Sequence, residues 1–120
     1  MCILIVEDED FVREILVDEL DFQGFDVCEA RSGDHATDLI QNPPRVFSLL
    51  ITGINMPGQR NGIEVAQLMR LHSPSVPIIF ITGRPDIPNF ARPLETNEFL
   101  LRKPFGMSEL MQVVTQMLRQ

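Results

Sequence analysis

Aromatic and basic residues are scarce in this 120-residue sequence. It has no tryptophan and no tyrosine, and seventeen acidic residues outnumber ten lysines and arginines, which gives a formal net charge of −7. The arginines are scattered and form no basic stretch. Such a surface repels phosphate backbones and anionic lipid heads. We therefore expect no direct binding to nucleic acid and none to a membrane.

Long apolar runs and cysteine motifs are also missing. No apolar stretch is long enough to span a bilayer, and Met1–Asp8 has no basic flank that would mark a secretory signal. A cytoplasmic location is the default expectation. Cys2 and Cys28 stand in apolar surroundings without Cys-x-x-Cys spacing. This favours reduced thiols packed in strands over a disulfide or a metal site.

Short apolar runs alternate with amphipathic stretches along the chain. The apolar runs predict five strands, over Cys2–Val6, Asp26–Glu29, Phe47–Thr52, Pro77–Thr82 and Phe99–Arg102. Helical spacing of apolar residues predicts three helices, over Phe11–Gln23, Ser32–Gln41 and Ile63–His72. Gly24 suits the stop of the first helix, and Ser108 suits the N-cap of a helix at the end of the chain.

This order of elements predicts an α/β fold. Strands that are apolar throughout, separated by helices, indicate a parallel sheet covered on both faces. For five strands the commonest arrangement is the flavodoxin-like (βα)5 three-layer sandwich with strand order 2-1-3-4-5. We expect a single domain over residues 1–120. Three prolines interrupt Gly83–Asn97, so a helix there should be short or distorted.

Polar residues stand where the predicted strands end. They are Glu7-Asp8-Glu9, Thr52-Gly53, Thr82-Gly83 and Lys103-Pro104. In an open parallel sheet the ligand site forms beyond these carboxyl ends. Carboxylates hold Mg²⁺, while lysine and hydroxyl groups contact phosphoryl oxygens. Each residue alone has an ordinary explanation as a solvated or turn residue. Together they predict a small pocket for phosphate and a hard cation.

Five segments carry a family resemblance: Ile3–Glu9, Leu49–Thr52, Asn55–Gly58, Ile79–Gly83 and Lys103–Phe105. In order and spacing they resemble the receiver domains of two-component response regulators. The resemblance implies that Glu7 and Asp8 are the acid pair that organises Mg²⁺, and that the backbone carbonyl of Asn55 completes the metal site. It implies that Thr82 is the hydroxyl that reports phosphorylation and that Lys103 pairs with the phosphoryl group.

Gly53 departs from the family pattern. It stands where receiver domains have the aspartate that is phosphorylated. Without a side chain it can neither accept a phosphoryl group nor ligate a metal, so Mg²⁺ binding should be weak. Thr52 should point to the other side of the strand, and a threonine phosphoester would be too inert to cycle. With the acceptor absent, we expect Lys103 to lean toward Glu7 or Asp8.

Leu100 is a second departure. It lies three residues before Lys103, where the family usually has a tyrosine or phenylalanine that reports phosphorylation, and Phe99 is its neighbour. By the same resemblance, Lys103-Pro104 matches a lysine–proline bond that is often cis.

The sequence thus predicts a receiver domain of two-component or phosphorelay signalling, not an enzyme, that is non-phosphorylatable as written. It would act by contact with a histidine kinase, a phosphotransfer protein or a downstream regulator, as a monomer or weak homodimer. One alternative is an ordinary receiver carrying an aspartate-to-glycine substitution. A nucleotide- or flavin-binding enzyme would need a glycine-rich loop where Glu7-Asp8-Glu9 stands. A DNA-binding regulator would need a further domain.

Overall fold

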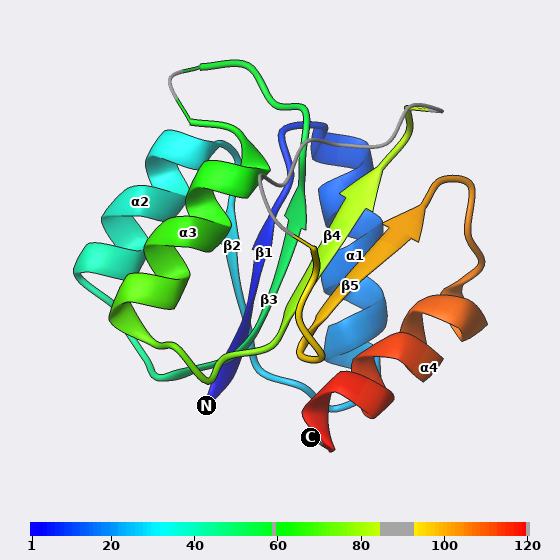
Figure 1. Ribbon diagram of the computed structural model, residues 1–120. Coiled ribbons are helices and arrows are strands. Elements are labelled where there is room, and N and C mark those ends of the chain that lie inside the picture. Colours follow the sequence, from blue (N-terminus) through cyan, green and yellow to red (C-terminus); the bar gives the residue numbers. More distant parts are fainter. Residues whose placement is uncertain (59, 85–92, 120) are drawn as a thin grey trace.

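The computed structural model describes residues 1–58, 60–84 and 93–119, which form a three-layer α/β sandwich (Figure 1). The strands in this part of the chain are β1 (Cys2–Val6), β2 (Val27–Ala30), β3 (Phe47–Gly53), β4 (Ile78–Thr82) and β5 (Glu98–Arg102). The helices there are α1 (Asp10–Phe22), α2 (Gly33–Gln41), α3 (Gly62–His72) and α4 (Met107–Leu118). The predicted strands and helices are present, with bounds that differ by one or two residues.

All strands of the sheet are parallel. Their order is β2-β1-β3-β4-β5, which confirms the predicted flavodoxin-like topology. In the central strand β3, Ile51 is paired with Ile5 of β1 and Ile79 of β4, and all three side chains are fully buried. Strands buried on both faces are apolar throughout, which is why the apolar runs of the sequence located them.

Two apolar cores hold the layers together. Helices α2 and α3 cover one face of the sheet, and α1 and α4 cover the other (Figure 1). Leu50 of β3 packs in the first core with Met69 of α3, and Leu49 packs in the second with Leu16 of α1. Burying each such side chain stabilises the fold by about 1.5–3 kcal/mol. The alternation of Leu49 and Leu50 between the cores follows from the two-residue period of a strand.

Local sequence explains the start of α2 and the end of α1, but it does not explain the start of α4. Ser32 caps α2 by accepting a hydrogen bond from the backbone N–H of His35 (3.0 Å), and Gly24 has the positive φ (+92°) suited to the residue after α1. The prediction that Ser108 caps α4 is wrong. Gly106 is the N-cap, because its backbone is extended and its carbonyl accepts the first helical bond, from Leu110 N–H (3.1 Å). Ser108 lies inside the first turn.

The predicted short helix within Gly83–Asn97 falls mainly on residues 85–92. These lie outside the described residues, so the helix stays a prediction. In the described part of the chain, every helix is too short or too polar to cross a membrane.

A buried ion pair closes the amino-terminal end of the sheet. Arg70, in the last turn of α3, contacts Glu98 at the start of β5 (Nη2 to Oε2, 3.2 Å). The same guanidinium donates to Asn97 Oδ1 (2.9 Å) and to the carbonyl of Val76. Glu98 also accepts from the backbone N–H of Glu95 (2.9 Å). This network joins α3 to the segments that begin β4 and β5.

Candidate functional site

A cavity of about 190 Å³ opens beyond the carboxyl ends of the central strands. Its lining combines acidic, basic and hydroxyl side chains with backbone: Glu7, Asp8, Glu9, Gly53, Ile54, Asn55, Ile81, Thr82, Gly83, Arg84 and Lys103. Of the residues that the sequence singled out for this edge, all but Thr52 and Pro104 line this pocket. The buried hydroxyl of Thr52 donates to the carbonyl oxygen of Gly53 (2.8 Å).

Glu7 is the buried acid of the cavity. It follows β1 directly and is 3% exposed. Its Oε2 accepts a hydrogen bond from the backbone N–H of Glu9 (3.2 Å), and its Oε1 lies 3.6 Å from Lys103 Nζ. Burial raises the pKa of Glu7, and a hydrogen bond with Asp8 adds to the effect, while the Glu9 N–H and the Lys103 ammonium oppose it. The carboxylate is thus only partly compensated.

Lys103 reaches the cavity from the end of β5. Its ammonium lies 3.6 Å from Glu7 Oε1 and 3.5 Å from Glu9 Oε1, so it does lean toward Glu7 as expected. The backbone N–H of Lys103 donates to the carbonyl of Thr82 (2.8 Å), which extends the β4–β5 ladder up to the site. The Lys103–Pro104 peptide bond is cis. The lysine therefore bridges two acids.

Thr82 ends β4 at the floor of the cavity. It is 2% exposed, and its Oγ1 accepts a hydrogen bond from the backbone N–H of Arg84 (3.2 Å). The hydroxyl hydrogen is therefore available to donate. A hydroxyl donor beside an ammonium is the arrangement that phosphoryl oxygens require.

Gly53 is not required by its own backbone. A Cβ at this position would lie 3.5 Å from Glu7 Oε1 and 3.8 Å from Met56 Cγ, which are ordinary contacts. A Cβ therefore fits there. Gly62 is the contrasting case, because a Cβ would lie 1.8 Å from the carbonyl oxygen of Gly53. Only glycine allows α3 to start so close to the end of β3. Sequence reasoning missed this role of Gly62, because the contact with Gly53 forms only when the two segments meet.

The residues present fit Mg²⁺ poorly. Asp8 is half-buried and Asn55 is exposed at the rim. They and Glu7 supply two carboxylates and one backbone carbonyl, and Gly53 supplies no side chain. Over the described ranges, His, Cys, Asp and Glu side chains form no group of three or more that could hold a metal ion. Mg²⁺ prefers near-octahedral oxygen ligands, and Gly53 removes one carboxylate from the set that the family resemblance implies.

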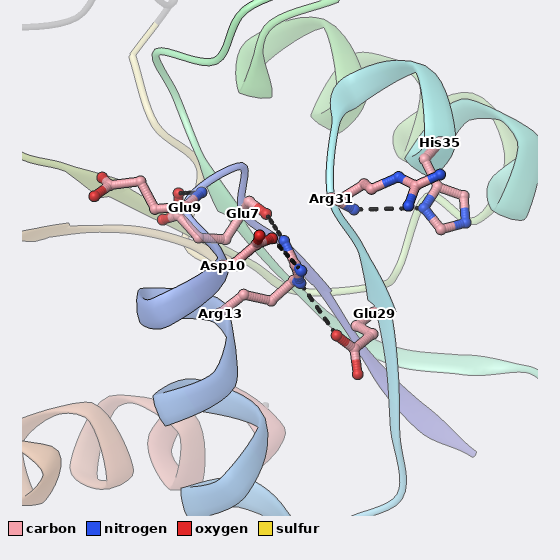
Figure 2. A network of polar contacts seen from close by, with 7 residues as sticks. All are labelled: Glu7, Glu9, Asp10, Arg13, Glu29, Arg31 and His35. Carbon is pink, nitrogen blue, oxygen red and sulfur yellow. Dashed lines mark hydrogen bonds and ion pairs between the residues drawn. The ribbon is translucent and has the colours of Figure 1, made fainter.

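Arg13 of α1 fixes the turn that carries the acids (Figure 2). Its Nη1 donates to the backbone carbonyl of Glu7 (2.9 Å), its Nη2 contacts Asp10 Oδ1 (2.6 Å), and its Nε contacts Glu29 Oε1 (3.1 Å). Three segments are thus tied to one guanidinium. The sequence signalled only the Asp10–Arg13 pair, by its i,i+3 spacing.

Leu100 and Phe99 pack on opposite faces of the sheet. Leu100 lies against the core beneath α2 and α3, whereas Phe99 lies against the core beneath α1 and α4. A neighbouring phenylalanine on the other face cannot take the place of an aromatic residue at position 100.

Comparison with known proteins identifies the family to which the chain belongs. Residues 3–115 match the response regulator receiver domain family, and the chain belongs to it. It is 34% identical to the response regulator receiver protein CpdR of Brucella abortus, over 97% of this chain and 95% of that protein. It is 32% identical to the transcriptional regulatory protein YkoG of Bacillus subtilis, over 98% of this chain and 51% of that protein. The chain therefore spans about half the length of YkoG.

Solved structures show the same fold. A response regulator receiver protein from Sinorhizobium medicae superposes with a TM-score of 0.89 at 26% identity, covering 99% of this chain and 94% of that one. The receiver domain of the hybrid histidine kinase CckA superposes with a TM-score of 0.83 at 31% identity, covering 98% and 99%.

Proposed function

We propose that this chain is a signalling receiver domain that is not phosphorylated at position 53 and acts through contacts with other proteins. The observation that carries the proposal is the cavity lined by Glu7, Asp8, Thr82 and Lys103, in which Gly53 stands where the family resemblance implies an acceptor aspartate. These residues supply carboxylates, a hydroxyl and an ammonium, and position 53 supplies no nucleophile.

The chemistry of the cavity supports a non-phosphorylatable domain. Covalent transfer needs a positioned nucleophile to take the phosphoryl group. Gly53 has none, and the hydroxyl of Thr52 is buried and bonded to the backbone. Lys103 already pairs with Glu7 and Glu9. The ammonium thus has anionic partners without a phosphoryl group.

If the domain is not phosphorylated, a partner protein can change its conformation only by binding one conformation more tightly than another. We propose a histidine kinase, a phosphotransfer protein or a downstream regulator of a two-component or phosphorelay pathway as the partner. The receiver domain of CckA, which belongs to a hybrid histidine kinase, supports this class of partner by similarity. Weak Mg²⁺ binding is part of the proposal, with Glu7, Asp8 and the Asn55 carbonyl as the residues that would hold the ion.

An ordinary receiver with an aspartate-to-glycine substitution is the competing proposal. It is favoured by the contacts at Gly53, because a Cβ there meets no atom closer than 3.5 Å. The two proposals predict the same inert protein as written. They differ in whether an aspartate at position 53 restores phosphorylation.

Treatment with acetyl phosphate and Mg²⁺ followed by intact mass spectrometry separates them. The Gly53 protein should gain no phosphate. Gly53→Asp should gain one phosphate that hydroxylamine removes if the rest of the pocket is functional, and the uncharged control Gly53→Asn should gain none. A stoichiometric, hydroxylamine-sensitive phosphate on the Gly53 protein would refute the proposed function. An inert Gly53→Asp would favour a pocket adapted to work without phosphorylation.

A further inference from the structure

Two cysteines far apart in the sequence meet at the edge of the sheet. Cys2 of β1 and Cys28 of β2 have their Sγ atoms 2.8 Å apart. This is closer than ordinary nonbonded contacts of about 3.5–4.0 Å between carbon atoms, and longer than a disulfide bond of about 2.05 Å. We propose that Cys2 and Cys28 are a redox-sensitive thiol pair that low-molecular-weight disulfides oxidise to an intramolecular disulfide.

The strand register explains why the thiols meet. Leu4 of β1 is paired with Cys28 of β2, so these two side chains lie on the same face of the sheet. Cys2 is two residues before Leu4 and shares that face by the period of the strand. Both cysteines pack against the core beneath α2 and α3. The diagonal between neighbouring strands thus brings the sulfur atoms into contact, and bond formation requires them to approach from 2.8 Å to about 2.05 Å.

The two thiols differ in access, which sets the order of reaction. Cys28 is half-buried on β2, an edge strand, whereas Cys2 is fully buried. Burial raises the pKa of the Cys2 thiol to about 12, and the hydrogen bond with Cys28 adds to this, while the Arg45 guanidinium opposes it. An external oxidant therefore meets Cys28 first, and Cys2 is the resolving thiol.

The reaction is a two-step thiol–disulfide exchange with glutathione disulfide as a representative oxidant. The Cys28 thiolate, after releasing its proton to solvent, attacks one sulfur of glutathione disulfide. The S–S bond breaks, one glutathione thiolate leaves, and a mixed disulfide forms on Cys28. The Cys2 sulfur then attacks the Cys28 sulfur and its proton passes to the departing glutathione thiolate, so the mixed disulfide bond breaks and the second glutathione leaves as a thiol. Two protein thiols are oxidised, and one glutathione disulfide is reduced to two glutathione molecules.

This thiol pair is independent of the proposed signalling function. It lies toward the amino ends of β1 and β2, whereas the Gly53 cavity lies beyond the carboxyl ends of the central strands. A bond between residues 2 and 28 would tie the edge strand to its neighbour. Closing that loop restricts the unfolded chain, so the oxidised protein should be the more stable form.

The test is oxidation of the native chain with glutathione disulfide, followed by alkylation and mass spectrometry. The wild type should lose both alkylatable thiols, keep no glutathione adduct, and yield a linked peptide pair containing Cys2 and Cys28. Cys2→Ala should instead accumulate one glutathione adduct at Cys28. Cys28→Ala should leave Cys2 reduced, because its thiol is buried. If Cys2→Ala does not fold by circular dichroism, Cys2→Val fills the site and serves in its place.

Two outcomes would overturn the proposal. One is a wild-type protein that keeps both thiols. The other is one that stops at the Cys28 adduct with Cys2 still alkylatable after unfolding. As a second readout, the melting temperature of the oxidised wild type should rise on the order of 10 °C and return on reduction. A lower melting temperature of the bridged form would show that the native spacing does not accommodate the bond.

Discussion

Two buried glutamates at opposite ends of the sheet are held in different ways. The Glu98 side chain is 1% exposed and faces the Arg70 guanidinium, with Nη2 at 3.2 Å and Nε at 3.3 Å from one carboxylate oxygen. The Glu7 side chain is 4% exposed, and its nearest cation, Lys103 Nζ, lies at 3.6 Å. Arginine offers a rigid planar fork, whereas lysine is a compact charge on a flexible stem. The first arrangement is locked, and the second is able to rearrange.

The difference separates the part of the molecule that maintains the fold from the part that can bind. At the amino end, Glu98 accepts hydrogen bonds from the Arg70 guanidinium of α3 and from the backbone N–H of Glu95, and the same guanidinium donates to Asn97 Oδ1, so these bonds join structural segments. At the carboxyl end, Lys103 is shared between Glu7 and Glu9 above an open cavity. Incomplete compensation of a buried charge in a cavity is characteristic of a functional site.

Breaking the Arg70–Glu98 ion pair should give the largest loss of stability. Arg70→Ala removes the guanidinium that contacts Glu98, Asn97 and the Val76 carbonyl together, so the free energy of unfolding should fall by about 3 kcal/mol. Urea unfolding followed by circular dichroism measures it. Arg70→Lys, which keeps the charge but not the fork, should lose less. A loss below about 1 kcal/mol for Arg70→Ala would show that this end of the sheet is not locked.

Adding a carboxylate at position 53, in the cavity, should give the second largest loss of stability. Gly53→Asp places a third acid beside Glu7 and Asp8, and repulsion should lower the free energy of unfolding by about 1–2 kcal/mol without Mg²⁺. Excess Mg²⁺ should remove most of that loss. Gly53→Asn, which has nearly the same volume and no charge, is the control. Equal stability of the two variants without Mg²⁺ would contradict the repulsion.

The charge of Glu7 itself should produce a pH dependence. Its pKa is raised in the folded protein, chiefly by burial, so the folded state favours the protonated form. The stability it contributes is complete below the unfolded pKa of about 4.3 and is lost as the pH rises through the folded pKa. Glu7→Gln should therefore melt higher than wild type at neutral pH and alike at acid pH. Glu14→Gln, which changes an exposed side chain, is the control. If Glu7→Gln were less stable than wild type at neutral pH, the charge of Glu7 would stabilise the fold, contrary to this prediction.

Removal of the Lys103 ammonium should have the smallest effect on the free energy of unfolding. The Lys103 side chain is 30% exposed, and partly exposed pairs contribute less than about 1 kcal/mol. Lys103→Ala should therefore change the free energy of unfolding by only a few tenths of a kcal/mol. The same urea titration used for Arg70→Ala measures it. A loss as large as that of Arg70→Ala would erase the distinction between the two ends.

Most of the fold could be predicted from the periodicity of the apolar residues. The buried strands are apolar from end to end, and the polar residues at their carboxyl ends predicted that Glu7, Gly53, Thr82 and Lys103 lie at one edge of the sheet. The predicted N-cap of α4 was wrong because Ser108 and Gly106 are both suitable N-cap residues, and the choice between them depends on the backbone angles.

Contacts between segments that are distant in the sequence could not be predicted from the periodicity and spacing of the residues. Arg13 and Arg70 gain their partners only when separate strands and helices meet. Gly62 is explained by a close approach to the Gly53 carbonyl, and no local spacing specifies such an approach. The contact of Cys2 with Cys28 depends on strand register, so residue types and spacing favoured only two separate reduced thiols.

Calorimetric titration with Mg²⁺ tests most directly the claim that the pocket is complete except for the carboxylate at position 53. The Gly53 protein should bind Mg²⁺ with a dissociation constant weaker than roughly 1 mM. Gly53→Asp should bind roughly tenfold more tightly or better, a gain of about 1.4 kcal/mol, and Gly53→Asn should not. Sub-millimolar affinity in the Gly53 protein, or no gain in Gly53→Asp, would contradict the account.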